Sequence, residues 1–117
     1  MEKILVVDDD KPTREALRAM LEVSGYEIIE AENGEEGLSL YRQELPDLVI
    51  IDLIMPEKEG IETIRELKRD FPEAKVFAIS GSGFEYLLAA SEFGALRTFM
   101  KPLHKDEIVA AVKDELV

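Results

Sequence analysis

The sequence predicts an α/β fold: a doubly wound, five-stranded parallel sheet in the order 2-1-3-4-5, with five helices distributed over both faces. Five short apolar runs alternate with five segments of helical periodicity, and such alternation is typical of parallel sheets with helical crossovers. Two runs, Ile4–Val7 and Leu48–Ile51, are apolar at every position, as expected for strands buried on both faces. Right-handed crossovers leave few topologies, and 2-1-3-4-5 is the common flavodoxin-like order for five strands.

Length and composition predict one cytoplasmic domain spanning residues 1–117. The 117 residues suffice for one domain but not for two, and an apolar content of 46% supports a packed core. The absence of cysteine excludes disulfides and cysteine-based zinc sites. No apolar run approaches the ~20 residues of a membrane span, and we expect neither a signal peptide nor a membrane contact. The net charge of −12 argues against direct binding of nucleic acid; it fits plain solubility, a bound cation or a basic partner.

The first strand and helix are defined by an apolar run and its flanking turn residues. The run Ile4–Val7 is followed by three aspartates, of which Asp10 is expected to cap the helix. Lys11-Pro12 suits the helix start because proline lacks only an amide that would be unpaired there. Gly25 suits the left-handed end of this helix. Its inward face is expected to comprise Ala16, Leu17, Met20 and Leu21.

The next elements lead to the central strand. A short strand is expected over 26–31, a turn at Asn33-Gly34 and a helix over 35–44. Pro46-Asp47 then breaks the helix and opens the strand that ends at Asp52. The inward face of this second helix is expected to comprise Gly37, Leu38, Tyr41 and Leu45.

The second half of the chain repeats the alternation. Apolar residues at 61, 64 and 67 mark a third helix that Phe71-Pro72 ends, and a strand follows over 75–79. The polar, glycine-containing stretch 80–83 precedes a weak apolar helix over 84–93. A fifth strand is expected over 97–100, and a last helix over about 105–115 has Ile108, Ala111 and Val112 facing inward.

Polar side chains converge where the strands end. Asp8 and Asp9 follow the first strand, Asp52 ends the third, Ser80 follows the fourth and Lys101 the fifth. In doubly wound folds ligands bind beyond these carboxyl ends, between strands 1 and 3. Three carboxylates at one point repel one another, so either one is protonated or a cation lies among them. A hard cation with oxygen ligands, above all Mg²⁺, fits this set, and because Mg²⁺ also accepts phosphate oxygens the site suits a phosphoryl group.

At these residues the chain resembles the receiver domain of bacterial two-component response regulators, of the chemotaxis-regulator type. The pieces that carry the resemblance occur in the expected order along the whole chain. They are Val6-Val7-Asp8-Asp9-Asp10, Ile51-Asp52-Leu53-Ile54-Met55-Pro56 with Gly60, Ser80-Gly81, Gly94-Ala95 and Lys101-Pro102.

The resemblance implies a phosphorylation switch, not an enzyme with turnover. Asp52 would accept a phosphoryl group from a sensor histidine kinase or phosphotransfer protein, with Lys101 and Ser80 contacting the phosphoryl oxygens. The face formed by helix 4, strand 5 and helix 5 would then signal to an output domain or effector. The Mg²⁺ ligands would be Asp8, Asp9, Asp52 and the main-chain carbonyl of Ile54. The peptide bond before Pro102 would be cis.

Some positions depart from this pattern. Thr98 stands where the family often has an aromatic residue, so coupling through a rotating ring is in doubt. The stretch from Ser80 to Gly94 is slightly short, which predicts a short or shifted fourth helix. Ile54 either shields the acyl phosphate from water or simply packs locally. His104 is expected to be solvated near the start of the last helix.

Three alternatives compete with the switch. A phosphatase of the haloacid-dehalogenase type also uses a nucleophilic aspartate with Mg²⁺, but it needs an aspartate two residues later, where this chain has Ile54. A flavodoxin-like FMN carrier is disfavoured because Asp8, Asp9 and Asp10 would repel the FMN phosphate. A receiver that works without phosphorylation is disfavoured because no acidic residue is missing. The sequence leaves open the kinase, the target, the phosphoryl lifetime, dimerisation and whether the chain belongs to a longer regulator.

Overall fold

The computed structural model describes residues 1–55, 60–81 and 83–117, which form ten alternating elements. The strands are β1 (Lys3–Val7), β2 (Glu27–Ala31), β3 (Leu48–Asp52), β4 (Val76–Ser80) and β5 (Arg97–Met100). The helices are α1 (Lys11–Glu22), α2 (Gly34–Glu44), α3 (Gly60–Asp70), α4 (Phe84–Glu92) and α5 (Lys105–Glu115). Among the described residues no helix is long and apolar enough to cross a membrane. The sequence expectations at Pro56 and at Ser82 lie outside the described residues.

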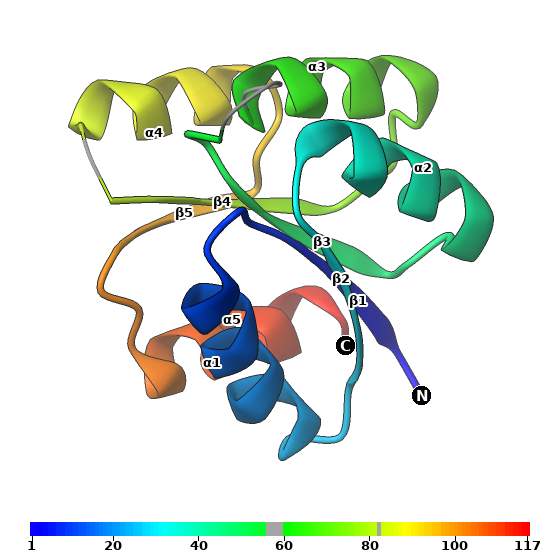
Figure 1. The fold of residues 1–117 in the computed structure, drawn as a ribbon, viewed down its shortest axis with the longest axis vertical. Helices are drawn as coiled ribbons and strands as arrows, with labels where there is room; N and C mark the ends of the chain where they lie inside the picture. The colour runs from blue at the N-terminus through cyan, green and yellow to red at the C-terminus, as the bar shows by residue number, and fades with distance from the viewer. Residues whose placement is uncertain (56–59, 82) are drawn as a thin grey trace.

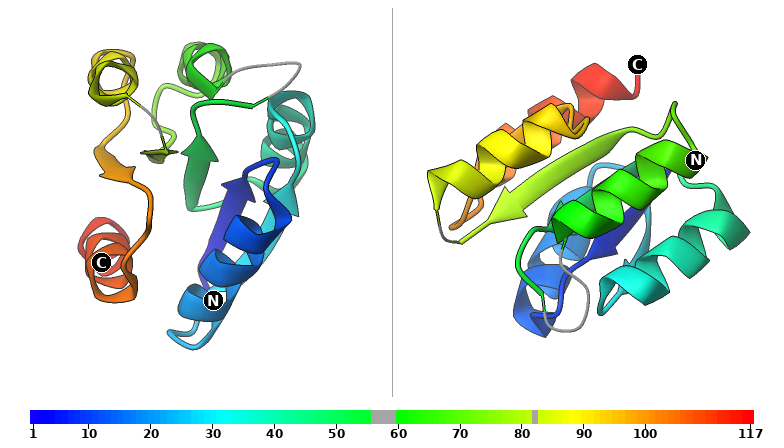
Figure 2. Two further views of the ribbon diagram at one scale, coloured as in Figure 1. Left: turned by 60° about the vertical axis from the view of Figure 1, so that its left-hand side comes forward. Right: turned by 90° about the horizontal axis from the view of Figure 1, so that it is seen from above.

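The five strands pair in parallel in the order β2-β1-β3-β4-β5, which confirms the predicted fold class. Helices α2, α3 and α4 cover one face of the sheet, and α1 and α5 cover the other (Figure 1). The view from above shows α2, α3 and α4 lying side by side over the strands (Figure 2). The order reverses between β1 and β3, so their carboxyl ends lie next to each other at the switch point.

Two hydrophobic cores explain why the central strands are apolar without a break. Successive side chains of a strand point to opposite faces. Val49 and Ile51 therefore pack under α2, α3 and α4, whereas Leu48 and Ile50 pack against α1 and α5. Every residue of β3 and β4 is buried, including Asp52 and Ser80 at their ends. The apolar runs thus bring two polar residues into the interior at one edge of the sheet.

The helix boundaries follow the expected signals with two corrections. Asp10 caps α1, because its carboxylate accepts a hydrogen bond from the Thr13 amide at 3.2 Å. Asn33, predicted to be part of a turn, caps α2 by accepting a hydrogen bond from the Glu36 amide, and Gly34 is the first helical residue. Leu45 is 63% exposed instead of inward, because it ends α2 in the left-handed conformation with φ of 46°.

The inward face of α1 also differs from the prediction. Leu17 and Leu21 are buried as expected, but Ala16 is exposed. The additional buried side chain of this face is Arg14. An arginine in this stripe is contrary to the usual rule that charged residues lie on the outer face, and its partners are part of the site described below.

Three further predictions about local structure are confirmed. Helix α4 has nine residues, fewer than the other helices of the described chain. The Lys101-Pro102 peptide bond is cis. His104 is exposed and directly precedes α5.

Candidate functional site: an acidic cluster at the switch point

Three aspartates meet at the carboxyl ends of β1 and β3. Asp8 and Asp9 follow β1, and Asp52 is the last residue of β3. Each offers one carboxylate oxygen, and these oxygens all lie within 4.8 Å of one another. Asp8 and Asp52 are buried, whereas Asp9 is exposed to solvent. The structure therefore brings together the three carboxylates that the sequence assigned to one site.

Lys101 is the cation next to this cluster. Its ammonium nitrogen lies 3.2 Å from Asp8 Oδ2 and 3.6 Å from Asp52 Oδ2. Burial opposes protonation of Lys101, but the charges of Asp8 and Asp52 outweigh it and hold the Lys101 pKa above its ordinary value. The lysine is therefore a fixed positive charge at this edge of the sheet.

Ser80 and Ile54 complete the set of predicted residues. Ser80 is fully buried at the end of β4, and its carbonyl accepts a hydrogen bond from the Lys101 amide at 2.9 Å. This bond ties the end of β4 to the residue that follows β5. The Ile54 amide lies 3.4 Å from Asp52 Oδ1, and the Ile54 side chain is 39% exposed.

The start of α3 is packed directly against the strand that carries Asp52. The Gly60 amide donates to the Leu53 carbonyl at 3.0 Å. A Cβ at Gly60 would lie 2.2 Å from the Asp52 carbonyl oxygen and 2.6 Å from Leu53 Cα. Only glycine allows this approach, so the identity of residue 60 fixes the distance between α3 and the site.

The buried carboxyl groups have perturbed acidities. Burial, followed by the negative charge of Asp8, raises the pKa of Asp52 from 3.8 to about 6, although Lys101 acts in the opposite direction. Burial also raises the pKa of Asp8. Such pKa shifts are typical of functional sites, where ionisable groups are buried next to other charges.

The donors of this cluster fit a hard divalent cation. All are carboxylate oxygens, as Mg²⁺ prefers. Three carboxylates and one ammonium leave two negative charges, which a divalent ion would balance. Among the described residues, Asp8 Oδ2 is the one buried side-chain oxygen or nitrogen without a hydrogen-bond partner; its contact with Lys101 is an ion pair. A carboxylate oxygen accepts more than one contact, so Asp8 Oδ2 has capacity for a cation besides its ion pair with Lys101.

Sequence reasoning missed two charged residues behind the cluster. The Arg14 guanidinium donates from Nη1 to the Asp8 carbonyl at 2.6 Å and from Nε to Glu30 Oε1 at 2.9 Å. Arg14 shares a helical face with Leu17 and Leu21, and Glu30 interrupts the apolar residues of β2. The sequence did contain a signal for this pair: Arg14 and Glu30 are charged residues at positions where the helix and strand patterns call for apolar ones.

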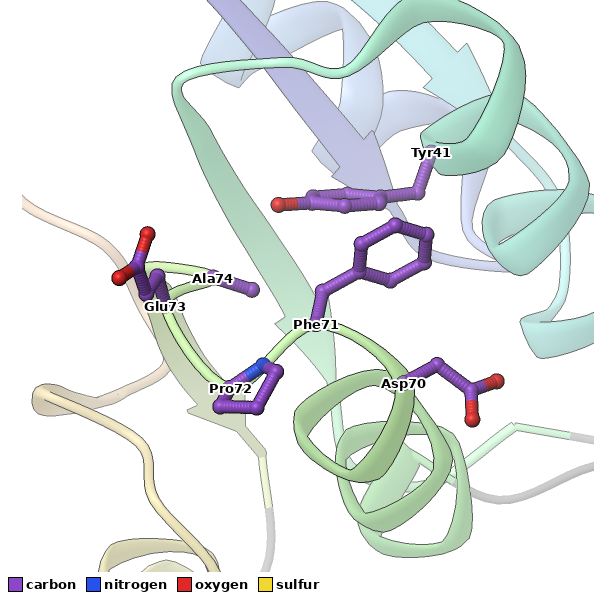
Figure 3. A pocket seen from close by; sticks show the side chains of 6 residues that line it. All are labelled: Tyr41, Asp70, Phe71, Pro72, Glu73 and Ala74. Carbon is purple, nitrogen blue, oxygen red and sulfur yellow. The ribbon is translucent and has the colours of Figure 1, made fainter.

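A hollow in the surface lies away from the acidic cluster. It has a volume of about 500 Å³ and is lined by Tyr41 and residues 70–74, with the rings of Tyr41 and Phe71 next to each other (Figure 3). Tyr41 lies near the end of α2, Asp70 ends α3, and residues 71–74 lead into β4, so the hollow is at the end of the sheet opposite to Asp52. None of the site residues predicted from the sequence lines this hollow.

Comparisons with known proteins agree with the fold and show the family. Residues 4–113 match the response regulator receiver domain family. The chain is 36% identical to sporulation initiation phosphotransferase F of Bacillus subtilis over 98% of this chain and 94% of that protein. It is 33% identical to chemotaxis protein CheY of the same organism over 97% of each.

A solved structure gives the same picture. The response regulator TrrA of Thermotoga maritima, determined in complex with Mg²⁺-BeF, is 37% identical with a TM-score of 0.92, over 99% of this chain and all of that one. In contrast, the chain spans about half the length of other relatives, such as 48% of the probable transcriptional regulator ycf27 of Porphyridium aerugineum. The chain belongs to the response regulator receiver domain family of two-component signalling.

Proposed function

We propose that this chain is a phosphoacceptor switch in which Asp52 takes a phosphoryl group from the phosphohistidine of a sensor histidine kinase or phosphotransfer protein. The observation that carries the proposal is the position of Asp52: buried at the end of the central strand, near two further carboxylates and 3.6 Å from Lys101. In the transfer, an Asp52 carboxylate oxygen forms a bond to phosphorus while the bond from phosphorus to the imidazole nitrogen breaks.

The residues around Asp52 have distinct parts in this proposal. Asp8, Asp9, Asp52 and the Ile54 carbonyl would hold Mg²⁺, which when bound neutralises charge on the phosphoryl oxygens. Asp52 must be ionised to attack, and with a pKa of about 6 it is mostly ionised at neutral pH. Lys101 pairs with a phosphoryl oxygen, and the Ser80 hydroxyl donates to another. The result is an acyl phosphate held by groups from three strand ends.

Phosphorylation of Asp52 would be transmitted to a partner through a change in the face formed by α4, β5 and α5. The phosphoryl group adds close to two negative charges next to Ser80 and Lys101, which lie at the ends of β4 and β5. Two new hydrogen bonds to a charged group provide about 3–6 kcal/mol, against ~5.5 kcal/mol for inverting a 1:99 equilibrium, so a substantial but incomplete shift is expected. Exposed apolar side chains that a partner would cover on or beside this face are Phe84, Tyr86, Leu88, Leu96 and Met100.

The phosphatase alternative is disfavoured at one position. Catalytic turnover of the acyl phosphate by the haloacid-dehalogenase mechanism needs an acid/base two residues after the nucleophile. Ile54 occupies that place, and its side chain cannot transfer a proton. We therefore propose a stoichiometric switch and not an enzyme, with a partner protein or output domain as the recipient of the signal.

Incubation of the full chain with acetyl phosphate tests this function, with intact mass as the readout. We expect gain of one phosphoryl group that requires Mg²⁺ and is absent in Asp52→Asn. Asp106→Asn, which removes an exposed carboxyl group in the first turn of α5, is the matched control and should be phosphorylated normally. Continuous release of phosphate without a trapped adduct would instead support the phosphatase.

A further inference from the structure

The β1–α1 loop is contacted from the interior by a partly buried ion pair, Arg14–Glu30, that the proposed chemistry does not use. Arg14 lies on α1 with only 8% of its surface exposed, and Glu30 lies on β2. The Arg14 Nε atom is 2.9 Å from Glu30 Oε1. The second Glu30 oxygen is 2.6 Å from Arg18 Nε, so both oxygens of this carboxylate are engaged.

Through Arg14 this pair reaches the first aspartate of the acidic cluster. The guanidinium donates from Nη1 to the Asp8 main-chain carbonyl at 2.6 Å. One rigid, planar group therefore bridges the backbone of Asp8 and the side chain of Glu30. A lysine has a single nitrogen and cannot reproduce this two-point contact.

The polar atoms of Asp8 show what this contact accomplishes. The Asp8 amide donates to the Ala31 carbonyl at 3.1 Å, and Asp8 Oδ1 accepts from the Asp10 amide at 2.9 Å. With the carbonyl bonded to Arg14, three of the four polar atoms are fixed by β2, α1 and the loop itself. The fourth atom, Oδ2, has no hydrogen-bond partner among the described residues and faces Lys101 in the cluster.

We propose that Arg14, held by Glu30, is a positioning residue that orients the Asp8–Asp9 backbone so that their carboxylates can bind a divalent cation together with Asp52. This inference rests on the proposed function, because it assumes that the acidic cluster is a cation site. Removal of a side chain that orients a metal ligand commonly weakens metal binding by 10–100-fold.

The sign of the effect separates positioning from simple charge. Replacing Arg14 by methionine removes a positive charge behind three carboxylates, and charge alone would therefore make Mg²⁺ bind more tightly. Loss of orientation would make Mg²⁺ bind more weakly. We expect about 10-fold weaker binding in Arg14→Met and a smaller loss in Arg14→Lys, which keeps the charge but only one of the two contacts.

Arg18 supplies a matched control. It lies on the same helix and pairs with the same Glu30, but within the described part of the chain its ion pairs are with Glu30 and Glu22 and not with the acidic loop. Arg18→Met changes the net charge by the same amount and also removes one ion pair of Glu30. We expect its Mg²⁺ affinity to stay at the wild-type value. Glu30→Ala should weaken Mg²⁺ binding in the wild type but add little in Arg14→Met, because Glu30 acts through Arg14.

The experiment is calorimetric titration of the full chain with MgCl₂, with urea unfolding of each variant to confirm that it is folded. Hydrogen exchange of the Asp10 amide without Mg²⁺ gives a second readout, and we expect faster exchange in Arg14→Met than in Arg18→Met. Equal or tighter Mg²⁺ binding by Arg14→Met would overturn the positioning role alone. Failure of the wild type to bind Mg²⁺ would overturn both this inference and the metal site of the proposed function.

Discussion

Asp52 combines two properties that oppose each other in the metal-free protein: it is buried, and its proposed function requires a negative charge. Burial and the nearby Asp8 raise its pKa from 3.8 to about 6, while Lys101 limits the shift. A carboxyl group whose pKa is raised on folding stabilises the folded state fully below its unfolded pKa. That contribution is lost as the pH rises through the folded pKa. Ionised Asp52 therefore costs stability at neutral pH.

Asp52→Asn should consequently stabilise the metal-free protein at neutral pH. We expect a gain of about 1–3 kcal/mol in the free energy of unfolding at about pH 7.5, since asparagine is uncharged at every pH. The gain should shrink as the pH falls from about 6 towards 4, where the aspartate is itself protonated. Urea unfolding with a chelator at several pH values measures this, and a gain independent of pH would show that ionisation of Asp52 is not its cause.

At the scale of secondary-structure elements, the site depends on how closely α3 approaches β3. The start of α3 lies against the backbone of Asp52 and Leu53, where a Cβ on Gly60 would collide with main-chain atoms. Main-chain atoms cannot move aside as the end of a flexible side chain can. The backbone that carries the acidic cluster is thus contacted by Gly60 of α3 at Asp52 and by Arg14 of α1 at Asp8.

Gly60→Ala should therefore be destabilising, although alanine is normally the better helix former. We expect a loss of about 1–3 kcal/mol, because relief of the contact requires α3 to shift away from β3. Gly81→Ala is the control, since its Cβ would lie 3.6 Å from Lys101 Cδ in ordinary contact. Urea unfolding measures the free energy of unfolding of both variants. Equal values would mean that the start of α3 can move away from β3 without loss of stability.

At the scale of the whole molecule, the net charge of −12 makes any cation stabilising to some extent. Specific binding can be separated from this general effect by comparing Mg²⁺ with Na⁺ at equal ionic strength. We expect Mg²⁺ to raise the melting temperature of the wild type more than Na⁺ does, because the proposed Mg²⁺ site forms only in the folded protein. The excess should be much smaller in Asp52→Asn, and an equal response to both salts would argue against a specific site.

The sequence predicted the fold because the buried strands are continuous apolar runs and the turn residues between them are clear. It also placed Asp8, Asp9, Asp52, Ser80 and Lys101 at one edge, since parallel strands all end there. It failed where a side chain departs from the average behaviour of its type. Leu45 is exposed because a left-handed residue turns the chain at the end of α2, and Arg14 is buried because Glu30 and the Asp8 carbonyl satisfy it. These contacts join the helix to the preceding loop and to β2, and they become visible only in three dimensions.

The central claim is that Asp52 itself carries the phosphoryl group, and direct identification of the modified residue tests it. The full chain would be phosphorylated with acetyl phosphate and Mg²⁺, then reduced with borohydride, which converts an aspartyl phosphate to homoserine that tandem mass spectrometry locates in the sequence. We expect homoserine at position 52 and none at the neighbouring Asp8 or Asp9. Homoserine at another aspartate, or a phosphoryl group found on His104 instead, would contradict the account.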